Sequence, residues 1–210
     1  MNERLSIGIT GGIGCGKSYI SKVLSADFGI PVYDCDKEAK RLTASSGEIR
    51  RQLVSLVGPD VYDASGLNRQ RLADYLFADA GHARRAGAII HPAVLKDFHA
   101  WAEKQQQPIV ALESAILFES GFNRHVDYVL FVDAPEGTRL RRAMQRDSAT
   151  EAQVRARMKM QQPEQYRSLA DFIIDNSTEK DPKLHEHLAR IVSILNSQPP
   201  TQPEKLVVRG

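Results

Sequence analysis

Residues 11–18, Gly11-Gly12-Ile13-Gly14-Cys15-Gly16-Lys17-Ser18, decide the fold of this 210-residue chain. They match G-x-x-x-x-G-K-[ST] in full, and they lie between a strand-like segment, residues 5–10, and a helical stretch with Ile20, Val23 and Leu24 on one face. In such a loop the glycines let backbone amides curl around phosphate oxygens, and the positive end of the following helix points at them. A glycine-rich turn that binds nothing is the alternative, and the flanking strand and helix argue against it.

The residue types of the loop predict specific contacts with a nucleotide. The Lys17 ammonium group can reach the β- and γ-phosphates, and the Ser18 hydroxyl can bind Mg²⁺. The Cys15 thiol lies beside Lys17 and a helix N-terminus, which lower thiol pKa values, but its position indicates no catalytic role. We expect nucleotide contacts from the loop and the residue after it: Gly11, Gly12, Ile13, Gly14, Cys15, Gly16, Lys17, Ser18 and Tyr19.

Four more apolar runs predict strands at residues 30–33, 108–112, 128–132 and 172–174. Continuously apolar strands separated by helical stretches are typical of a parallel sheet covered on both faces. Four of the five strands are followed by an acidic residue within two positions, at the carboxyl ends where such sheets bind ligands. The sequence therefore predicts an α/β fold of the P-loop NTPase type, with a five-stranded parallel sheet and helices on both faces.

Composition excludes several classes of protein. The formal net charge is only +2, whereas a general nucleic-acid or membrane-surface binder departs further from neutrality. Two cysteines cannot form a zinc site or a disulfide scaffold. No apolar run approaches the ~20 residues of a membrane span, and the first residues lack the apolar run of a signal peptide. We expect a cytoplasmic protein without nucleic-acid or membrane partners, whose oligomeric state the sequence leaves open.

Two insertions and a tail complete the predicted organisation. About seventy residues between the second and third strands look entirely helical, with Pro92 suited to a first helical position after His91. A second insertion, residues 139–159, holds seven basic and two acidic residues. We expect one domain over 1–200, with a core at 1–40, 106–135 and 165–195, a helical subdomain at 41–105, a lid at 136–164, and a disordered tail at 197–210.

Acidic side chains are candidates for proton transfer and metal binding. In extended chain Asp34 and Asp36 project to the same side, so both could face the phosphates, and one could act as a base. The alternative is a solvated turn in which an aspartate caps a helix that begins near Lys37. Glu113 and Glu119 could bind a metal-bound water or cap a loop.

Basic side chains in the second insertion repeat at helical spacing. Arg139, Arg142 and Arg146 share one helix face, and arginine forks bind phosphate, so a mobile lid over ATP is one interpretation. A solvated charged face, with Arg146 paired to Asp147, is the second, and a nucleic-acid surface is the third.

With these residues in place, the chain resembles the dephospho-coenzyme A kinase family from about residue 5 to residue 176. The resemblance is carried by the loop at 10–18, Asp34-Cys35-Asp36, His91-Pro92, Leu117-Phe118-Glu119, Arg142 with Arg146-Asp147, Gln161 and Asp175-Asn176. It implies that Asp36 is the base and a metal ligand beside Ser18, and that Lys17 and Arg146 are catalytic. It also implies that Arg142 and Asn176 bind the nucleotide, Asn176 near the adenine, and that Asp34, His91, Pro92 and Glu119 bind the acceptor.

The resemblance further implies ATP and Mg²⁺ as cofactors, and phosphorylation of the ribose 3′-hydroxyl of dephospho-coenzyme A in a three-part architecture of core, helical subdomain and lid. A kinase for another nucleoside or small alcohol remains an alternative, separated only by the helical subdomain. A nucleotide-dependent switch would need an N-K-x-D motif, which is absent. A nucleic-acid-binding protein would lose affinity steeply with salt.

Overall fold

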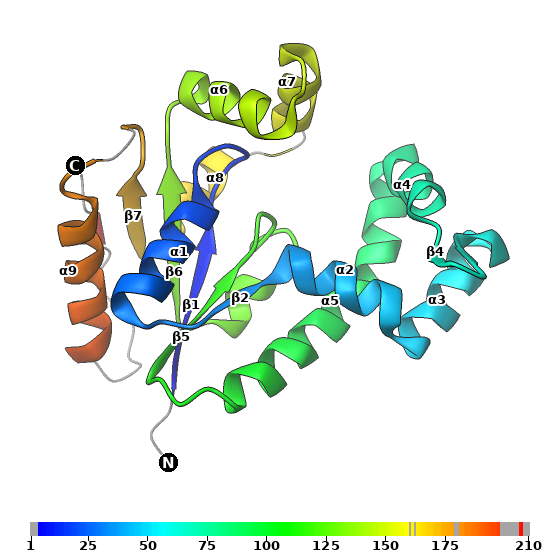
Figure 1. Ribbon diagram of the computed structural model, residues 1–210, viewed down its shortest axis with the longest axis horizontal. Coiled ribbons are helices and arrows are strands. Elements are labelled where there is room, and N and C mark those ends of the chain that lie inside the picture. Colours follow the sequence, from blue (N-terminus) through cyan, green and yellow to red (C-terminus); the bar gives the residue numbers. More distant parts are fainter. Residues whose placement is uncertain (1–3, 160, 162, 179–180, 198–205, 208–210) are drawn as a thin grey trace. The chain divides into compact units, whose positions relative to one another are not determined.

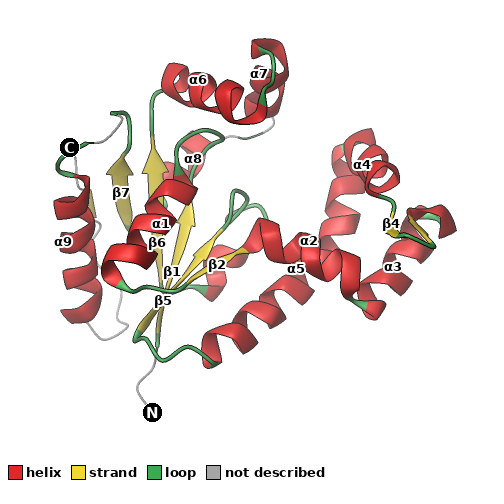
Figure 2. Ribbon diagram, in the orientation of Figure 1, coloured by secondary structure: helices red, strands yellow, loops and turns green. Residues whose placement is uncertain are grey.

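Two units make up the chain: residues 1–33 with 105–210, and residues 34–104. The computed structural model describes residues 4–159, 161, 163–178, 181–197 and 206–207. Figures 1 and 2 show a sheet with helices in the first unit, and helices with a short hairpin in the second. Each unit has its own hydrophobic core.

The sheet of the first unit runs in the order β2-β5-β1-β6-β7-β8. Its strands are β1 (Leu5–Thr10), β2 (Val32–Asp34), β5 (Ile109–Glu113), β6 (Tyr128–Asp133), β7 (Phe172–Asp175) and β8 (Leu206–Val207). β1 pairs in parallel with β5 and β6, and β6 pairs in parallel with β7. The predicted fold class and its five strands are confirmed, and the last residues of four strands are acidic: Asp34, Glu113, Asp133 and Asp175.

Two helices pack on one face of this sheet. Helix α1 (Lys17–Phe28) and helix α9 (Leu184–Ser197) share a core with alternate strand residues. Ile20 of α1 and Leu188 of α9 are fully buried in this core with Ile9 of β1. On the other face Gly8 leaves room for Leu117, since a Cβ there would lie 2.8 Å from the Leu117 Cδ2. β1 is thus packed from both sides, which fixes the loop that follows it.

Short helices connect the later strands. They are η2 (Phe122–His125), α6 (Glu136–Asp147), α7 (Glu151–Lys159) and α8 (Pro163–Arg167). Ser148 caps the C-terminus of α6, where it adopts φ 48° and donates its N–H to the Met144 carbonyl. Helices α6 and α7 enclose a small core of Leu140, Ala143 and Val154. The two helices lie within residues 136–164, and the role of this segment as a lid stays a prediction; it is called the lid segment below.

The second unit begins at Asp34 rather than near residue 41. It contains α2 (Cys35–Ser45), α3 (Gly47–Val57), η1 (Pro59–Val61), β3 (Tyr62–Asp63), β4 (Gly66–Leu67), α4 (Arg69–Ala78) and α5 (Ala80–Glu103). A side chain caps the start of each α-helix, and the caps are Asp34, Ser46, Asn68 and Asp79. Helix α5 contacts α2, α3 and α4, so it is the central helix of this unit.

The prediction of an entirely helical insertion is wrong at the β3–β4 hairpin. Tyr62 pairs with Leu67, and Asp63 pairs with Gly66. The Asp63 carboxylate accepts hydrogen bonds from the Ser65 backbone N–H at 2.7 Å and the Ser65 hydroxyl at 2.6 Å. Gly66 has φ 116°, a conformation that other residues rarely adopt. Local turn chemistry therefore overrides helix formation at these positions.

The predicted helix start at Pro92 is also wrong, because Pro92 lies inside α5. Proline has no N–H, so α5 loses the bond to the Ala88 carbonyl, yet the helix continues. Val94 and Phe98 follow the proline in α5 and are buried. Their packing stabilises the part of the helix after Pro92. Further along α5 the rings of Phe98 and Trp101 stack, with centroids 6.2 Å apart.

The predicted tail from residue 197 differs from the structure at its described positions. Ser197 is the last residue of α9, and Leu206 and Val207 form β8, which pairs in parallel with Phe172 and Ile173 of β7. β8 is therefore the edge strand of the sheet, beside β7. The rest of the predicted tail lies outside the described residues.

Candidate active site

The loop at residues 11–18 has the predicted position, between β1 and α1. Gly11, Gly14 and Gly16 all have positive φ, at 147°, 77° and 96°. Each also touches another element. A Cβ added to Gly11 would lie 2.3 Å from the Val132 carbonyl oxygen, and one added to Gly14 would lie 2.1 Å from the Arg139 carbonyl oxygen. A Cβ added to Gly16 would lie 2.1 Å from the Asn176 Nδ2. The loop is thus clamped by the ends of β6 and β7 and by α6, and side chains at these positions would force it apart.

The other loop residues divide into buried and exposed positions. The Cys15 side chain is fully buried in the sheet core, so the structure gives its thiol no access to solvent. Ile13 packs against the small core of α6 and α7, which joins the loop to the lid segment. Tyr19, predicted to contact nucleotide, is 48% exposed at the start of α1.

The Lys17 ammonium group lies on the carbonyls of its own loop. It donates to the Gly11 oxygen at 2.9 Å and to the Gly12 oxygen at 3.4 Å. Its stem is therefore folded back across the loop rather than extended into solvent. A phosphate group in the loop would bring a full negative charge to a cation already held there.

Ser18, in the first turn of α1, and Glu113, the last residue of β5, form a polar pair. The Ser18 hydroxyl donates to the Glu113 Oε1 at 2.8 Å, and Glu113 ends β5, the neighbour of β1. A hydroxyl and a carboxylate suit Mg²⁺, which commonly binds one or two protein oxygens together with substrate phosphates and waters. Across the described part of the chain, no group of three or more His, Cys, Asp and Glu side chains is placed to hold a metal ion.

The predicted extended conformation of Asp34-Cys35-Asp36 is wrong. Asp34 ends β2 and caps α2, where its carboxylate accepts the Lys37 N–H at 3.0 Å. Asp36 lies in the first turn of α2, so the two side chains do not alternate as they would on a strand. Asp34 thus fills the capping role weighed as the alternative, and its part in acceptor binding stays a prediction. Ser18 and Asp36 belong to different units, and their joint metal role stays a prediction.

Two arginines of α6 make different contacts: Arg142 bonds to a residue beside the loop, and Arg146 bonds within the lid segment. Arg142 donates from Nη1 to the Asn176 carbonyl at 2.7 Å, close to Gly16. Arg146 forks onto Asp147, with distances of 2.7 Å from Nε and 3.0 Å from Nη2. The Arg157 Nη1 joins the same carboxylate at 2.8 Å. The predicted internal pair is present, and these cations hold the pKa of Asp147 at about 2.

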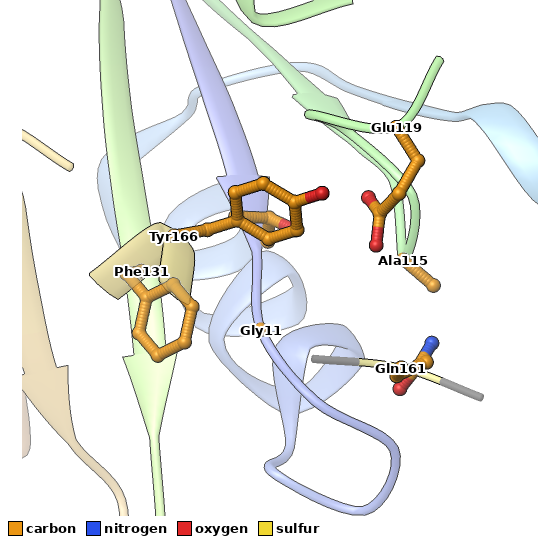
Figure 3. Close-up of a pocket in the computed structure, with 7 residues that line it drawn as sticks. Gly11, Ala115, Glu119, Phe131, Gln161 and Tyr166 are labelled. Atoms are coloured by element: carbon orange, nitrogen blue, oxygen red, sulfur yellow. The ribbon is translucent and has the colours of Figure 1, made fainter. Parts of the chain in front are cut away.

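A pocket beside the loop collects several predicted residues. It is lined by Thr10, Gly11, Ala115, Glu119, Phe131, Gln161 and Tyr166. Figure 3 shows Glu119, Ala115 and Gln161 to the right of Gly11 and Phe131 to its left, with the Tyr166 ring between Phe131 and Glu119. The Gln161 Oε1 accepts a hydrogen bond from the Ile13 N–H at 2.9 Å. The Tyr166 ring stacks on the Phe118 ring, with the ring centroids 4.7 Å apart. Burial raises the pKa of the Glu119 carboxyl.

His91 and Pro92 lie in the second unit, within α5. Burial lowers the pKa of the His91 imidazole, which favours its neutral form. The ring packs against Gly87, where an added Cβ would lie 2.8 Å from the His91 Cε1. The structure thus assigns His91 a half-buried position on the central helix, neither a helix cap nor an exposed group.

Two functional contacts were missed by sequence reasoning. Asn176 donates from Nδ2 to the Cys15 carbonyl at 2.8 Å, although its predicted role was near the base. Arg139 is 11% exposed, its Nη2 lies 3.8 Å from the Glu164 Oε1, and its Nε is buried without a hydrogen-bond partner. Its backbone carbonyl faces Gly14, a contact that only the packing of α6 on the loop creates.

No helix in the described ranges is long and apolar enough to cross a membrane.

Comparison with known proteins identifies relatives along nearly the whole chain. A protein from Porphyromonas gingivalis named dephospho-CoA kinase is 42% identical over 96% of this chain and 100% of its own length. The crystal structure of a Thermus thermophilus protein has a TM-score of 0.78 at 30% identity, covering 94% of this chain and 99% of that one. The dephospho-CoA kinase from Campylobacter jejuni shares the fold, with a TM-score of 0.63 at 20% identity over 90% of this chain and 96% of its own.

The family model described as Dephospho-CoA kinase matches residues 5–181. That range includes the loop, the Ser18–Glu113 pair, α2, α5, the lid segment and Asn176. The family match and the 42% identity to a relative over its whole length show that this chain belongs to the dephospho-CoA kinase family.

Proposed function

We propose that this protein transfers the γ-phosphoryl group of ATP to the ribose 3′-hydroxyl of dephospho-coenzyme A, giving coenzyme A and ADP. The observation that carries the proposal is the loop at 11–18, clamped at three glycines and paired through Ser18 to Glu113, inside a family match over residues 5–181. This is the last step of coenzyme A synthesis, and we assign it to the cytoplasm, without nucleic-acid or membrane partners.

The first unit provides the groups that would hold the nucleotide. Loop amides at a helix N-terminus bind phosphate oxygens, and Lys17 adds a cation beside them. ATP would supply the phosphoryl group, and Ser18 would hold Mg²⁺, which would offset the negative charge of the phosphates. Arg142 and Arg146 supply planar donors from α6 for the oxygens of the transferred group. Arg146 exchanges its fork on Asp147 for that contact.

The second unit would hold the acceptor. We assign its recognition to His91 and Pro92 on α5, with Asp34, and with Glu119 from the loop after β5. Asp36 accepts the proton of the 3′-hydroxyl while the hydroxyl oxygen bonds to the γ-phosphorus and the bond to the ADP oxygen breaks. We propose that the helical subdomain predicted at residues 41–105, most of which lies in the second unit, binds the acceptor, and that residues 136–164 form the lid.

The test is mass spectrometry of the products from ATP with dephospho-coenzyme A, its 3′-deoxy analogue and its 2′-deoxy analogue. We expect phosphate on the parent and on the 2′-deoxy compound, and none on the 3′-deoxy compound. Phosphate on the 3′-deoxy analogue contradicts the acceptor position. Turnover of shikimate or a nucleoside in place of dephospho-coenzyme A overturns the proposed substrate.

A substitution at the proposed base gives a second test. Asp36→Asn keeps the size of the side chain but removes its basicity, so ATP still binds while turnover collapses. Isothermal titration with ATP and a turnover assay separate the two effects. Near-normal turnover by Asp36→Asn would transfer the base role to another group.

A further inference from the structure

Asn176 is a buried junction of the first unit. It follows β7 directly and is only 5% exposed. Its backbone N–H donates to the Asp133 carbonyl at 2.8 Å, and its carbonyl accepts the Arg142 Nη1 at 2.7 Å. Its side-chain Nδ2 donates to the Cys15 carbonyl at 2.8 Å. One residue thus joins the end of β6, helix α6 and the phosphate-binding loop.

The bond to Cys15 acts on the peptide that lines the loop. Because a trans peptide is planar, its C=O and its N–H point in opposite directions. The Asn176 amide fixes the direction of the Cys15 carbonyl and thereby the direction of the Gly16 N–H. That N–H lies in the run of loop amides that forms an anion-binding concavity.

Gly16 leaves the space that this bond needs. A Cβ at Gly16 would lie 2.1 Å from the Asn176 Nδ2, so the amide packs directly on the Gly16 backbone. The amide also has no room to swing toward Gly16, because the backbone already occupies that side. The arrangement is therefore a fixed contact between a buried donor and a loop carbonyl, which is costly to break.

We propose that Asn176 is a positioning residue that sets the geometry of the phosphate-binding loop, and that Arg142 ties this residue to helix α6. The inference rests on one part of the proposed function, which is that the protein binds a nucleotide as substrate. Asn176 acts on the phosphates through Cys15 and Gly16. It does not select the base, which is the role that the family resemblance implied.

The two roles differ in what they change. A contact to the base alters the preference among nucleotides and leaves binding of a base-free polyphosphate unaffected. A residue that shapes the loop changes affinity for phosphates whatever base is attached. Inorganic tripolyphosphate with Mg²⁺ is therefore the diagnostic probe, with the ratio of kcat/KM for ATP and GTP as the second readout.

The experiment uses Asn176→Ala and Asn176→Asp in the full chain. Both lose the donated bond, and the aspartate also sets a negative oxygen against the Cys15 carbonyl. We expect affinity for tripolyphosphate and for ATP to fall by the same factor, about tenfold for Asn176→Ala. We expect the ATP to GTP ratio to stay unchanged. Asn176→Ser keeps a hydroxyl donor on a shorter side chain, so we expect a smaller loss of affinity. This variant replaces the other two if they do not fold.

Asp127→Ala is the matched control. Asp127 accepts from the Ser6 N–H and the Ser6 hydroxyl, both at 2.7 Å, at the amino end of β1. Its loss lowers thermal stability without changing affinity for tripolyphosphate. Asn176 variants that lose only thermal stability, or that change the ATP to GTP ratio while tripolyphosphate affinity is kept, overturn the inference. Because tripolyphosphate binding needs no acceptor, the result stands whether or not dephospho-coenzyme A is phosphorylated.

Discussion

Lys17 has its ammonium group 2.9 Å from the Gly11 carbonyl, inside the loop that would receive the phosphates. Lys17→Ala removes that charge and leaves the glycine contacts of the loop intact. We expect kcat to fall by at least ~10²–10³-fold, as when a group that stabilises transition-state charge is deleted. Steady-state turnover and circular dichroism check the result. Lys22→Ala, on an exposed face of α1, should retain wild-type turnover, and full activity in folded Lys17→Ala contradicts the loop assignment.

Glu113 accepts the Ser18 hydroxyl at 2.8 Å. Glu113→Gln keeps an acceptor for that hydroxyl but removes the negative charge beside the expected Mg²⁺. Groups that orient a metal ligand are commonly worth ~10–100-fold in metal affinity. We expect the Mg²⁺ concentration for half-maximal turnover to rise by about that factor, measured by titrating MgCl₂ at fixed ATP. Glu186→Gln, exposed on α9, is the control, and an unchanged Mg²⁺ requirement in Glu113→Gln would contradict the assignment.

Asp147 links the two helices of the lid segment, because it pairs with Arg146 of α6 and Arg157 of α7. These pairs lower the pKa of Asp147 from 3.8 to about 2. A carboxyl whose pKa is lower in the folded state stabilises that state above the unfolded value, and this contribution is lost as pH falls through the folded value. The link between α6 and α7 should therefore hold at neutral pH and weaken as pH falls from about 4 toward about 2.

Asp147→Asn gives the comparison. Amides of α7 should exchange faster in this variant than in the wild type at neutral pH, and the difference should shrink below the unfolded pKa. Hydrogen exchange resolved by peptide at several pH values measures it. Equal exchange in both proteins at neutral pH would mean that the pairs do not hold α7 to α6.

Helix α5 contains a glycine that accommodates the ring of His91. Gly87→Ala favours a helix by about 1 kcal/mol in isolation, but the new Cβ meets the imidazole. We expect KM for dephospho-coenzyme A to rise severalfold with a smaller change in kcat, because the ring must rotate away from its position. Gly47→Ala is the control, since a Cβ there has only Arg51 nearby, at 3.9 Å. A KM equal to the wild-type value in Gly87→Ala would remove His91 from the acceptor site.

At the scale of the whole molecule, the two units have separate cores and separate proposed ligands. ATP that binds the first unit stabilises it by about 2.7 kcal/mol at a hundredfold excess over Kd. Hydrogen exchange should then show protection in peptides from β1, α1 and β6, with little change in α3 and α4. Equal protection in both units would mean that they open as one cooperative body.

Much of the first unit could be predicted from the sequence, because buried parallel strands are continuous apolar runs and the loop has a full motif. Contacts between distant segments could not. Asn176 meets Cys15 across 161 residues and Ser18 meets Glu113 across 95 residues, and both depend on which strands are neighbours. Pro92 and Asp36 were misplaced for a local reason. A proline inside a helix and a helix that begins one residue after a strand are both decided by packing and capping rather than by residue type.

The stacked pair of Phe98 and Trp101 gives the protein a natural optical reporter. Trp101 is the single tryptophan of the chain, and it lies on α5 in the second unit. Indole emission therefore reports from α5, and the first unit contributes no tryptophan emission. Acceptor binding and unfolding of the helical unit can be observed by fluorescence in the unmodified protein, with no dye or engineered label.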